Sequence, residues 1–301
     1  MIPKVFIIIL QYNNSQDTMR CLNSVKELDY QNHEVIVVDN GSDAKHIEVL
    51  KDIASPLNLQ CPKIKIIALD SNLGYSGGNN AGIKHALERG ADYVFILNPD
   101  TTIEKNVLTK LIETAKSDPQ IGILGPAINE NGQIIYGGQI KWLKPELSHL
   151  VVEPLSPLSG STTKCYASGA AMLIKRKVVE KIGLLDERFF LYFEDADYCL
   201  RGQKAGYKLK IAPEAFVHHK PSSSTFSLGA PLLLRYHYRN AHLFNYKNGP
   251  FWAKLALPFW SIFIIIKQII KITLIPTKRE ISKAILAGVG DFYRGKFGQI
   301  N

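Results

Sequence analysis

Short apolar runs rich in β-branched residues alternate with helical patterns over the first 125 residues, and this alternation limits the fold more than any other feature. It is typical of βαβ units around a mostly parallel sheet whose faces are covered by helices. Ser15 is a candidate cap for the first helix, in which apolar residues recur at helical spacing from Met19 to Leu28. The expected strands are Val5–Leu10, Glu34–Asp39, Lys65–Leu69, Tyr93–Leu97 and Ile121–Gly125.

The segments after this alternation complete the same core. A glycine- and asparagine-rich segment, 74–80, precedes a helical stretch from Ala81 to Arg89, and we expect a loop there, at a strand's carboxyl end where α/β sheets bind ligands. Residues 126–165 contain a hairpin-like turn at 129–132 and a Pro-, Ser- and Gly-rich stretch from Pro145 to Ser161, which predict an excursion. Regular elements then return: a strand at Ala170–Ile174, helices at Lys177–Ile182 and from Glu194, and a strand at Lys208–Ile211.

Composition excludes some classes of protein. With 46% hydrophobic and 21% charged residues, the 301-residue chain can bury a core and is not intrinsically disordered. Lysine and arginine number 36 against 27 acidic residues, and the net charge of +9 favours acidic partners: nucleotide phosphates, anionic lipid or nucleic acid. No nucleic-acid recognition motif is present, so we expect no nucleic-acid partner. Four scattered cysteines and an N-terminal apolar run too short for a signal sequence predict a cytoplasmic protein.

The most apolar part of the chain runs from Phe251 to Ile275 and is interrupted by Pro258, Lys267, Gln268 and Lys271. It therefore falls short of the roughly 18 uninterrupted apolar residues expected of a spanning helix. With Trp260 and neighbouring basic residues, it fits a helix lying in the interface of an anionic membrane. A helix packed on the domain or on a partner subunit is the alternative.

Two expected strands end in a carboxylate. Asp39 is followed by a Gly-Ser turn and could accept hydrogen bonds from a bound base or ribose, but it could equally belong to a turn and helix cap. Asp100, in Asn98-Pro99-Asp100, is a hard oxygen ligand that could hold Mg²⁺ or Mn²⁺ against a diphosphate, or part of a plain turn.

A third cluster follows an aromatic run. Glu194, Asp195 and Asp197 stand at an expected helix start, where acids complement the helix dipole. Three of them beside residues 189–193 suggest a general base in a pocket that stacks on a flat or sugar-like ligand. His218 and His219 follow, and we expect at most one of them to bind a metal, because adjacent side chains point different ways.

Taken in order, these motifs resemble inverting glycosyltransferase family 2, particularly its rhamnosyltransferase-like branch, over roughly residues 3 to 245. The resemblance implies a GT-A fold: a Rossmann-like, mostly parallel sheet flanked by helices, with a nucleotide-sugar-binding half (1–125), an acceptor and catalytic half (126–245) and an apolar, basic helical extension (246–301). The motifs are Gln11-Tyr12-Asn13, Val38-Asp39-Asn40-Gly41-Ser42, Asn72 to Asn80, Asn98-Pro99-Asp100, Ser168-Gly169-Ala170-Ala171, Glu194-Asp195-Ala196-Asp197 and His218.

The resemblance also implies roles for single residues. Asp195 would be the catalytic base and Glu194 would position the acceptor or support the base, while Asp197 pairs with Arg201 one helical turn later. Asp100 and His218 would bind Mg²⁺ or Mn²⁺. The family's signature is Asp-x-Asp, but its first position is occupied by Asn98 in this sequence, and Asn98 would contact the donor instead of the metal. The other residues implied to bind the donor are Gln11, Asn13, Asp39, Asn79 and Gly169.

The expected reaction is one in-line displacement by an acceptor hydroxyl at the anomeric carbon. A dTDP-linked deoxysugar such as rhamnose is the first candidate donor and a UDP-hexose the second; the acceptor would be a surface glycan or a lipid-linked one at the inner face of the plasma membrane. A nucleotidyltransferase would need a basic, glycine-rich phosphate loop that residues 11–15 do not offer. A non-catalytic sugar- or membrane-binding module of the same fold is the remaining alternative.

Overall fold

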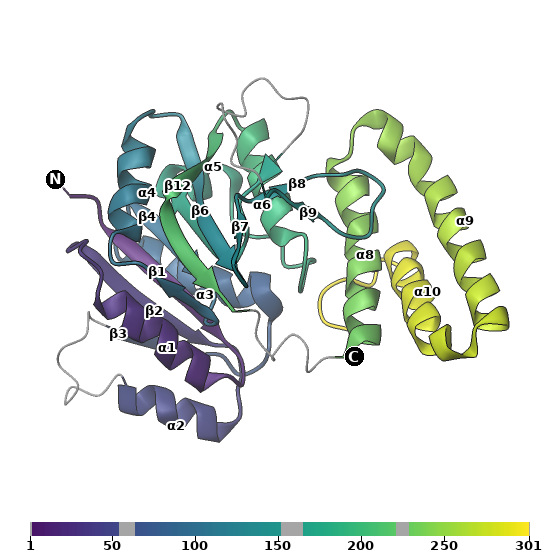
Figure 1. Ribbon diagram of the computed structural model, residues 1–301, viewed down its shortest axis with the longest axis horizontal. Helices are drawn as coiled ribbons and strands as arrows, with labels where there is room; N and C mark the ends of the chain where they lie inside the picture. The colour runs from purple at the N-terminus through teal and green to yellow at the C-terminus, as the bar shows by residue number, and fades with distance from the viewer. Residues whose placement is uncertain (1, 54–63, 152–164, 221–228, 301) are drawn as a thin grey trace.

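The computed structural model describes residues 2–53, 64–151, 165–220 and 229–300. Within these ranges nine strands form one mixed sheet, in the order β3-β2-β1-β4-β11-β6-β12-β5 with β7 beside β6 (Figure 1). β3, β2, β1 and β4 are parallel, and β12 is parallel to β6. The strands are β1 (Val5–Gln11), β2 (His33–Asp39), β3 (Ile64–Ala68), β4 (Tyr93–Leu97), β5 (Thr101–Ile103), β6 (Ile121–Glu130), β7 (Gln133–Ile135), β11 (Ala171–Lys175) and β12 (Lys208–His219).

Helices cover both faces of this sheet, because successive side chains of a strand point to opposite faces. Ile7 of β1 packs in a cluster with residues of α1 (Ser15–Lys26), α2 (Ala44–Ile53) and α4 (Val107–Lys116). Ile8, the next residue, packs in the opposite cluster with residues of α3 (Gly74–Glu88), α5 (Arg176–Ile182) and α6 (Glu194–Lys204). The α/β fold expected from the sequence is confirmed.

The expected strands and later helices are present, and two strands extend five or more residues beyond their predicted ends. β6 continues to Glu130, where the turn at 129–132 joins it to β7. β12 continues through an irregularity between Ala212 and Phe216 to His219. The excursion contains a small antiparallel sheet of β8 (Gly138–Gln139), β9 (Ser148–His149) and β10 (Cys165–Tyr166), while residues 152–161 of the predicted Pro-, Ser- and Gly-rich stretch lie outside the described residues.

Two local predictions were wrong. The segment 74–80 is not a loop, because α3 begins at Gly74, seven residues earlier than predicted. Its glycines serve close packing: a Cβ on Gly78 would lie 2.3 Å from Leu10 Cδ1, and one on Gly74 would lie 2.4 Å from the Phe190 carbonyl oxygen. Asn14, not Ser15, caps α1, since its side chain accepts a hydrogen bond from the amide of Asp17.

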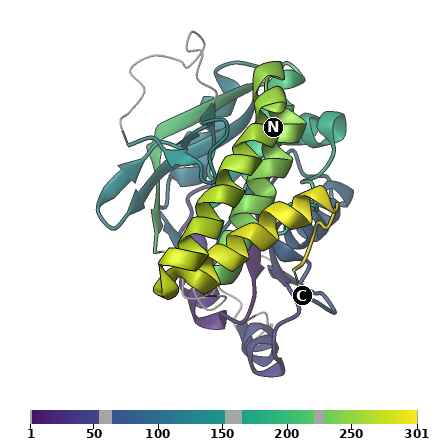
Figure 2. The same cartoon turned by 90° about the vertical axis from the view of Figure 1, so that its right-hand side faces the viewer.

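The C-terminal helices form a separate layer beside the α/β body (Figures 1 and 2). α8 (Ala230–Asn248), α9 (Phe251–Leu274), η3 (Pro276–Lys278) and α10 (Arg279–Tyr293) follow one another, and the expected boundary at residue 245 falls inside α8. Side chains join the three α-helices: His242 lies 3.1 Å from the Ser261 hydroxyl, which lies 2.7 Å from that of Tyr293.

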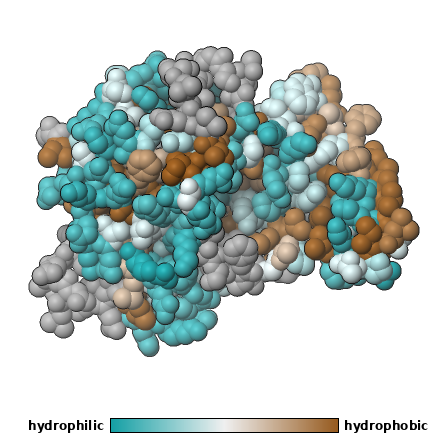
Figure 3. All heavy atoms as spheres, in the orientation of Figure 1, coloured by the Kyte–Doolittle hydropathy of each residue, from teal (hydrophilic) through white to brown (hydrophobic). Residues whose placement is uncertain are grey.

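α9 exposes one face and buries the other. Its buried residues recur every three or four positions, whereas large apolar residues on the opposite side are exposed, with Phe259 and Leu274 both 74% exposed. Figure 3 shows the resulting hydrophobic surface at the edge of the molecule. By length and composition α9 could cross a membrane, which the interrupted pattern did not indicate. Trp260, expected to face lipid, instead stacks on His242 of α8 with ring centroids 4.5 Å apart. The buried residues are Ala253, Leu257, Ser261, Ile264 and Gln268.

Candidate functional site

Two adjacent carboxylates open α6: Glu194 is buried and Asp195 is partly exposed. Asp195 accepts hydrogen bonds from the backbone amides of Gly169, at 3.0 Å, and Ala196, at 2.7 Å. Burial raises the pKa of Asp195, and these amide hydrogen bonds oppose that rise. Burial and then the charge of Asp195 raise the pKa of Glu194 well above its usual value. Glu194 Oε2 has no hydrogen-bond partner among the residues described, so it can bind a ligand hydroxyl.

Tyr75 of α3 marks the point where the two halves of the domain meet. Its hydroxyl donates a 2.5 Å hydrogen bond to the Gly169 carbonyl oxygen. Burial raises the pKa of Tyr75 far above its usual value, and the charges of Glu194, Asp195 and Asp100 raise it further. These carboxylates come from two parts of the chain: Glu194 and Asp195 open α6, and Asp100 follows β4. A Cβ on Gly169 would lie 2.8 Å from that hydroxyl oxygen, so glycine is required for this close contact.

Asp100 meets a histidine of β12 at the other side of the site. His219 Nε2 lies 3.4 Å from Asp100 Oδ1, and His219 Nδ1 lies 3.2 Å from Glu130 Oε2. Burial lowers the pKa of His219, but its hydrogen bonds and charge interactions with Asp100 and Glu130 outweigh burial, and the net shift is upward. His218, the expected metal ligand, instead lies 3.9 Å from Glu104 and is about half exposed. The structure thus brings together Asp100 and His219, and not Asp100 and His218.

The Asp100–His219 pair fits a hard divalent cation by its chemistry. A carboxylate oxygen and an imidazole nitrogen are both ligands of Mn²⁺, and Mg²⁺ in nucleotide sites takes one or two protein ligands with the remainder from phosphate and water. Among the residues described, no group of three or more His, Cys, Asp or Glu side chains could hold a metal ion. Two protein ligands leave coordination positions for a diphosphate.

The residues expected to face the nucleotide form a hydrogen-bonded cluster at the carboxyl ends of β1 and β2. Gln11 donates from Nε2 to Asp39 Oδ1 and to the Ser42 hydroxyl, the latter at 2.9 Å. The amide of Ser42 donates to Asp39 Oδ2, and the amide of Asn13 to the Ser42 hydroxyl. Gln11 and Asp39 are fully buried, so a nucleotide could touch them only if the neighbouring chain moved. Asn13 and Ser42 are partly exposed.

Asn79 and Asn98 have different surroundings. Asn79 is fully buried within α3, where its Nδ2 donates to the Tyr75 carbonyl oxygen. Asn98 is partly exposed, and its backbone amide donates to the Ala170 carbonyl oxygen at 2.9 Å. Asn79 Oδ1 is buried and has no hydrogen-bond partner among the residues described, so a contact of Asn79 with a donor, like that of the partly exposed Asn98, stays a prediction.

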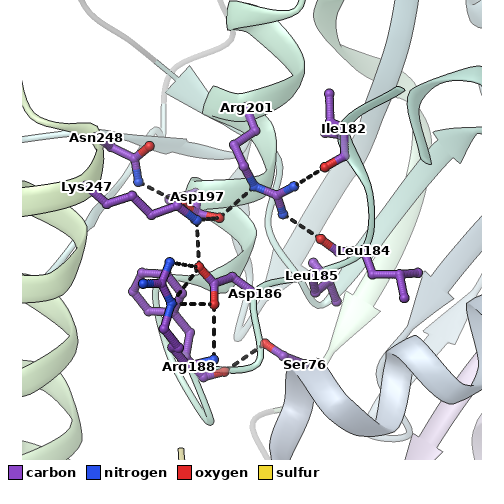
Figure 4. A network of polar contacts seen from close by, with 12 residues as sticks. Ser76, Ile182, Leu184, Leu185, Asp186, Arg188, Asp197, Arg201, Lys247 and Asn248 are labelled. Atoms are coloured by element: carbon purple, nitrogen blue, oxygen red, sulfur yellow. Dashed lines mark hydrogen bonds and ion pairs between the residues drawn. The ribbon is translucent and has the colours of Figure 1, made fainter. Parts of the chain in front are cut away.

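A buried ionic network holds α6 against α8 (Figure 4). Arg201 pairs with Asp197 at 2.9 Å, which confirms the predicted pairing. Lys247 of α8 bridges Asp197, at 2.8 Å, and Asp186, at 2.7 Å, and Asn248 donates to Asp197 at 2.7 Å. Asp197, two residues after Asp195, is fully buried, and hydrogen-bond donors surround its carboxylate.

Sequence reasoning did not single out Tyr75, and of the two histidines it preferred His218 to His219, which the structure places beside Asp100. Tyr75 stood inside a motif that was interpreted as a loop, and its contact with Gly169 spans 94 residues, which no local pattern reveals. The choice between two adjacent histidines depends on the pairing of β12 with β5, where His219 opposes Thr101, the residue after Asp100.

The chain is similar in sequence to known proteins. The sequence model named Glycosyl transferase family 2 matches residues 6–183. The chain is 27% identical to the dTDP-rhamnosyl transferase RfbF of Shigella flexneri over 82% of each protein. It is 29% identical to the hexosyltransferase Agl10 of Haloferax volcanii, over 75% of this chain and 70% of that protein. It is 25% identical to the N-acetylglucosaminyl-diphospho-decaprenol L-rhamnosyltransferase of Mycobacterium tuberculosis, over 85% of this chain and 88% of that protein.

Solved structures share the fold at low sequence identity. The mannosyltransferase PcManGT of Pyrobaculum calidifontis, in complex with GDP-Man and Mn²⁺, has a TM-score of 0.59 and 14% identity, with 98% of this chain and 88% of that one covered. Residues 1–349 of TarS from S. aureus, in complex with UDP-GlcNAc, have a TM-score of 0.58 and 13% identity, with 99% and 94% covered.

Proposed function

The chain belongs to glycosyltransferase family 2, and we propose that it transfers a sugar from a nucleoside diphosphate donor to an acceptor hydroxyl with inversion at the anomeric carbon. The observation that carries this proposal is the set of hydrogen bonds at Gly169 and Ala170. The Gly169 amide donates to Asp195 at 3.0 Å, and the Ala170 carbonyl oxygen accepts from the amide of Asn98, two residues before Asp100. These contacts support a shared site with a candidate base on one side and a candidate cation ligand on the other.

In this mechanism Asp195 is the general base. Its raised pKa makes its carboxylate a better proton acceptor, and the amides of Gly169 and Ala196 fix its orientation. As the acceptor oxygen bonds to the anomeric carbon, its proton passes to Asp195 and the bond to the diphosphate oxygen breaks. One displacement inverts the configuration. Glu194, whose Oε2 is unpartnered among the described residues, orients the acceptor by hydrogen bonding.

Asp100 and His219 would hold Mg²⁺ or Mn²⁺, and we propose His219 as the histidine ligand in place of His218 because of its 3.4 Å distance to Asp100. A cation bound there supplies positive charge beside the departing diphosphate. Asn98, Asn13 and Ser42 lie on the donor side and are partly exposed, so they are the proposed direct contacts to the donor. The buried Gln11 and Asp39 support Ser42.

The names of the relatives support a donor and an acceptor class. The Shigella relative is named for dTDP-rhamnose and the Haloferax one as a hexosyltransferase, so a dTDP-deoxysugar is the first proposed donor and a UDP-hexose the second. The mycobacterial relative is named for a polyprenyl diphosphate-linked acceptor. We accordingly propose a surface-glycan or lipid-linked acceptor that is reached at the cytoplasmic leaflet.

α9 supports a location at the membrane surface. Its exposed apolar face lies opposite the face packed on α8 and α10, and it carries no acidic residue, while Lys254 and Lys267 flank the apolar face. A helix so arranged can insert its apolar face into the acyl boundary with lysines near anionic headgroups. Because the other face holds Ser261 and Gln268 against the protein, we propose that α9 lies in the membrane plane and does not span it.

Vesicle flotation tests this location. Vesicles of phosphatidylcholine with phosphatidylglycerol should carry the protein upward, and vesicles of phosphatidylcholine alone should carry less of it. Phe259→Asn with Ile266→Asn should abolish flotation, whereas Leu73→Asn, which alters a 46% exposed leucine on the α/β body, should not. Equal flotation of all three folded proteins would remove α9 as the contact.

Calorimetry with UDP-, GDP- and dTDP-sugars, with Mg²⁺ or Mn²⁺ present, tests the donor site. We expect one nucleotide class to bind in a metal-dependent way and Asp100→Ala to weaken that binding. If no nucleotide sugar binds the folded protein, the non-catalytic module is the correct interpretation.

A further inference from the structure

The backbone just before the catalytic carboxylates is in an unusual conformation. Tyr192 and Phe193 have φ angles of 73° and 74°, in the left-handed region that side chains other than glycine rarely adopt. Phe193 is also the N-cap of α6 and makes no side-chain capping hydrogen bond. Glu194 and Asp195 follow at once, so the direction of their side chains depends on this double turn keeping its conformation.

Asn240 of α8 holds the carbonyl groups of this turn. Its Nδ2 donates to the carbonyl oxygens of Leu191, at 2.7 Å, and Tyr192, at 3.2 Å. Its Oδ1 accepts a hydrogen bond from Arg239 Nε at 3.0 Å, and because arginine can only donate, this contact fixes which way the amide points. Asn240 and Arg239 are both almost completely buried, with no more than 1% exposed.

Aromatic contacts from the same helix support the turn on both sides. Phe190 stacks on Tyr236 with ring centroids 5.4 Å apart, and Tyr192 stacks on His237 at 3.9 Å. Aromatic stacking fixes the rings, but it satisfies none of the carbonyl groups between them. Asn240 is therefore the side chain that joins these carbonyls to α8.

We propose that Asn240, oriented by Arg239, is a positioning residue that holds the 191–193 turn in the conformation that presents Glu194 and Asp195 to the reacting groups. This inference rests on the proposed function. It also gives the C-terminal helices a second role, because α8, which packs with the membrane-facing α9, completes the catalytic half of the body.

Steady-state kinetics of the full-length enzyme test this role. Asn240→Ala should lower kcat about tenfold or more, as expected when reacting groups are displaced by a fraction of an ångström, and should leave donor affinity by calorimetry unchanged. Asn245→Ala is the matched control: it removes another buried asparagine of α8, whose Nδ2 donates to Ala241 of its own helix and whose Oδ1 accepts from the Leu143 amide, outside the 191–193 turn. A kcat for Asn240→Ala within twofold of wild type, or an equal loss in both variants, would overturn the proposal.

Hydrogen exchange gives a readout that does not depend on activity. The amides of residues 190–196 should exchange faster in Asn240→Ala than in Asn245→Ala or wild type. If the wild-type protein transfers no sugar, the proposed function fails while this measurement still decides whether Asn240 holds the turn; unchanged exchange there would show that it does not.

Discussion

Replacing Lys247 by methionine should destabilise the protein, because Lys247 is the cation shared by two enclosed carboxylates in Figure 4. Its ammonium group lies 2.8 Å from Asp197, whose side chain is fully buried, and 2.7 Å from Asp186, whose side chain is 14% exposed. Removing one partner of a buried ion pair typically costs about 3–5 kcal/mol. Arg201 and Asn248 still contact Asp197 in the variant, so we expect the lower end, about 3 kcal/mol.

Urea unfolding followed by circular dichroism measures this difference. Lys283→Met is the matched control, because Lys283 pairs with Glu280 at 2.9 Å but both side chains are well exposed, and its loss should cost no more than about 0.5 kcal/mol. Equal stability of Lys247→Met and wild type would refute the reasoning that these charges are desolvated.

The loss of stability in Lys247→Met should depend on pH. Burial acts to raise the pKa of Asp186, but hydrogen bonds from Arg188 and Lys247 outweigh it and hold the pKa below its ordinary value. A carboxylate with a depressed pKa contributes stability above its unfolded pKa, about 4, and that contribution is lost as the pH falls through the lower, folded value. The deficit of Lys247→Met should therefore be full at pH 7 and smaller at about pH 3.

Three further predictions concern single residues. Gly169→Ala should lower kcat at least tenfold, since its Cβ would lie 2.8 Å from the Tyr75 hydroxyl oxygen and force the surroundings of the base apart; steady-state kinetics of the folded variant would show it. Burial lowers the pKa of His242 to about 4, so as the pH falls the histidine takes up a proton in the unfolded state before it does so in the folded state. The free energy of unfolding should therefore fall by up to about 3 kcal/mol from pH 7 to pH 4. His242→Gln should flatten that part of the stability curve measured with urea. His219→Ala should weaken Mn²⁺-dependent donor binding in calorimetry, and His218→Ala should not; the reverse pattern would restore the original assignment.

The fold could be predicted from the sequence largely because its strands are continuous apolar runs. Tyr93–Leu97 was predicted with the bounds that β4 has, since both faces of that strand are buried and each residue is apolar. The start of α3 could not be predicted in this way. Five of its first seven residues are glycine or asparagine, which disfavour helices locally, and their packing against Leu10 and Phe190 is visible only in three dimensions.

The site shows the same division between local and distant information. The acids Asp100, Glu194 and Asp195 could be predicted as candidates because charged residues at the ends of apolar segments are informative by themselves. Which histidine lies beside Asp100 depended on strand register, and a shift of one residue moves a side chain to the other face of a sheet. Similarly, Trp260 was expected to face lipid, but its position around α9 places it against His242.

The most direct test of the account is a transfer assay that compares wild type with Asp195→Asn, using the nucleotide sugar that binds in calorimetry and an acceptor with a free hydroxyl. A general base contributes about 10²–10⁴-fold to the rate, so we predict a loss of kcat in that range for Asp195→Asn, with donor affinity unchanged and an inverted anomeric product from wild type. A variant that turns over at nearly the wild-type rate, or a product with retained configuration, would contradict the assignment of Asp195 as the base of a single displacement.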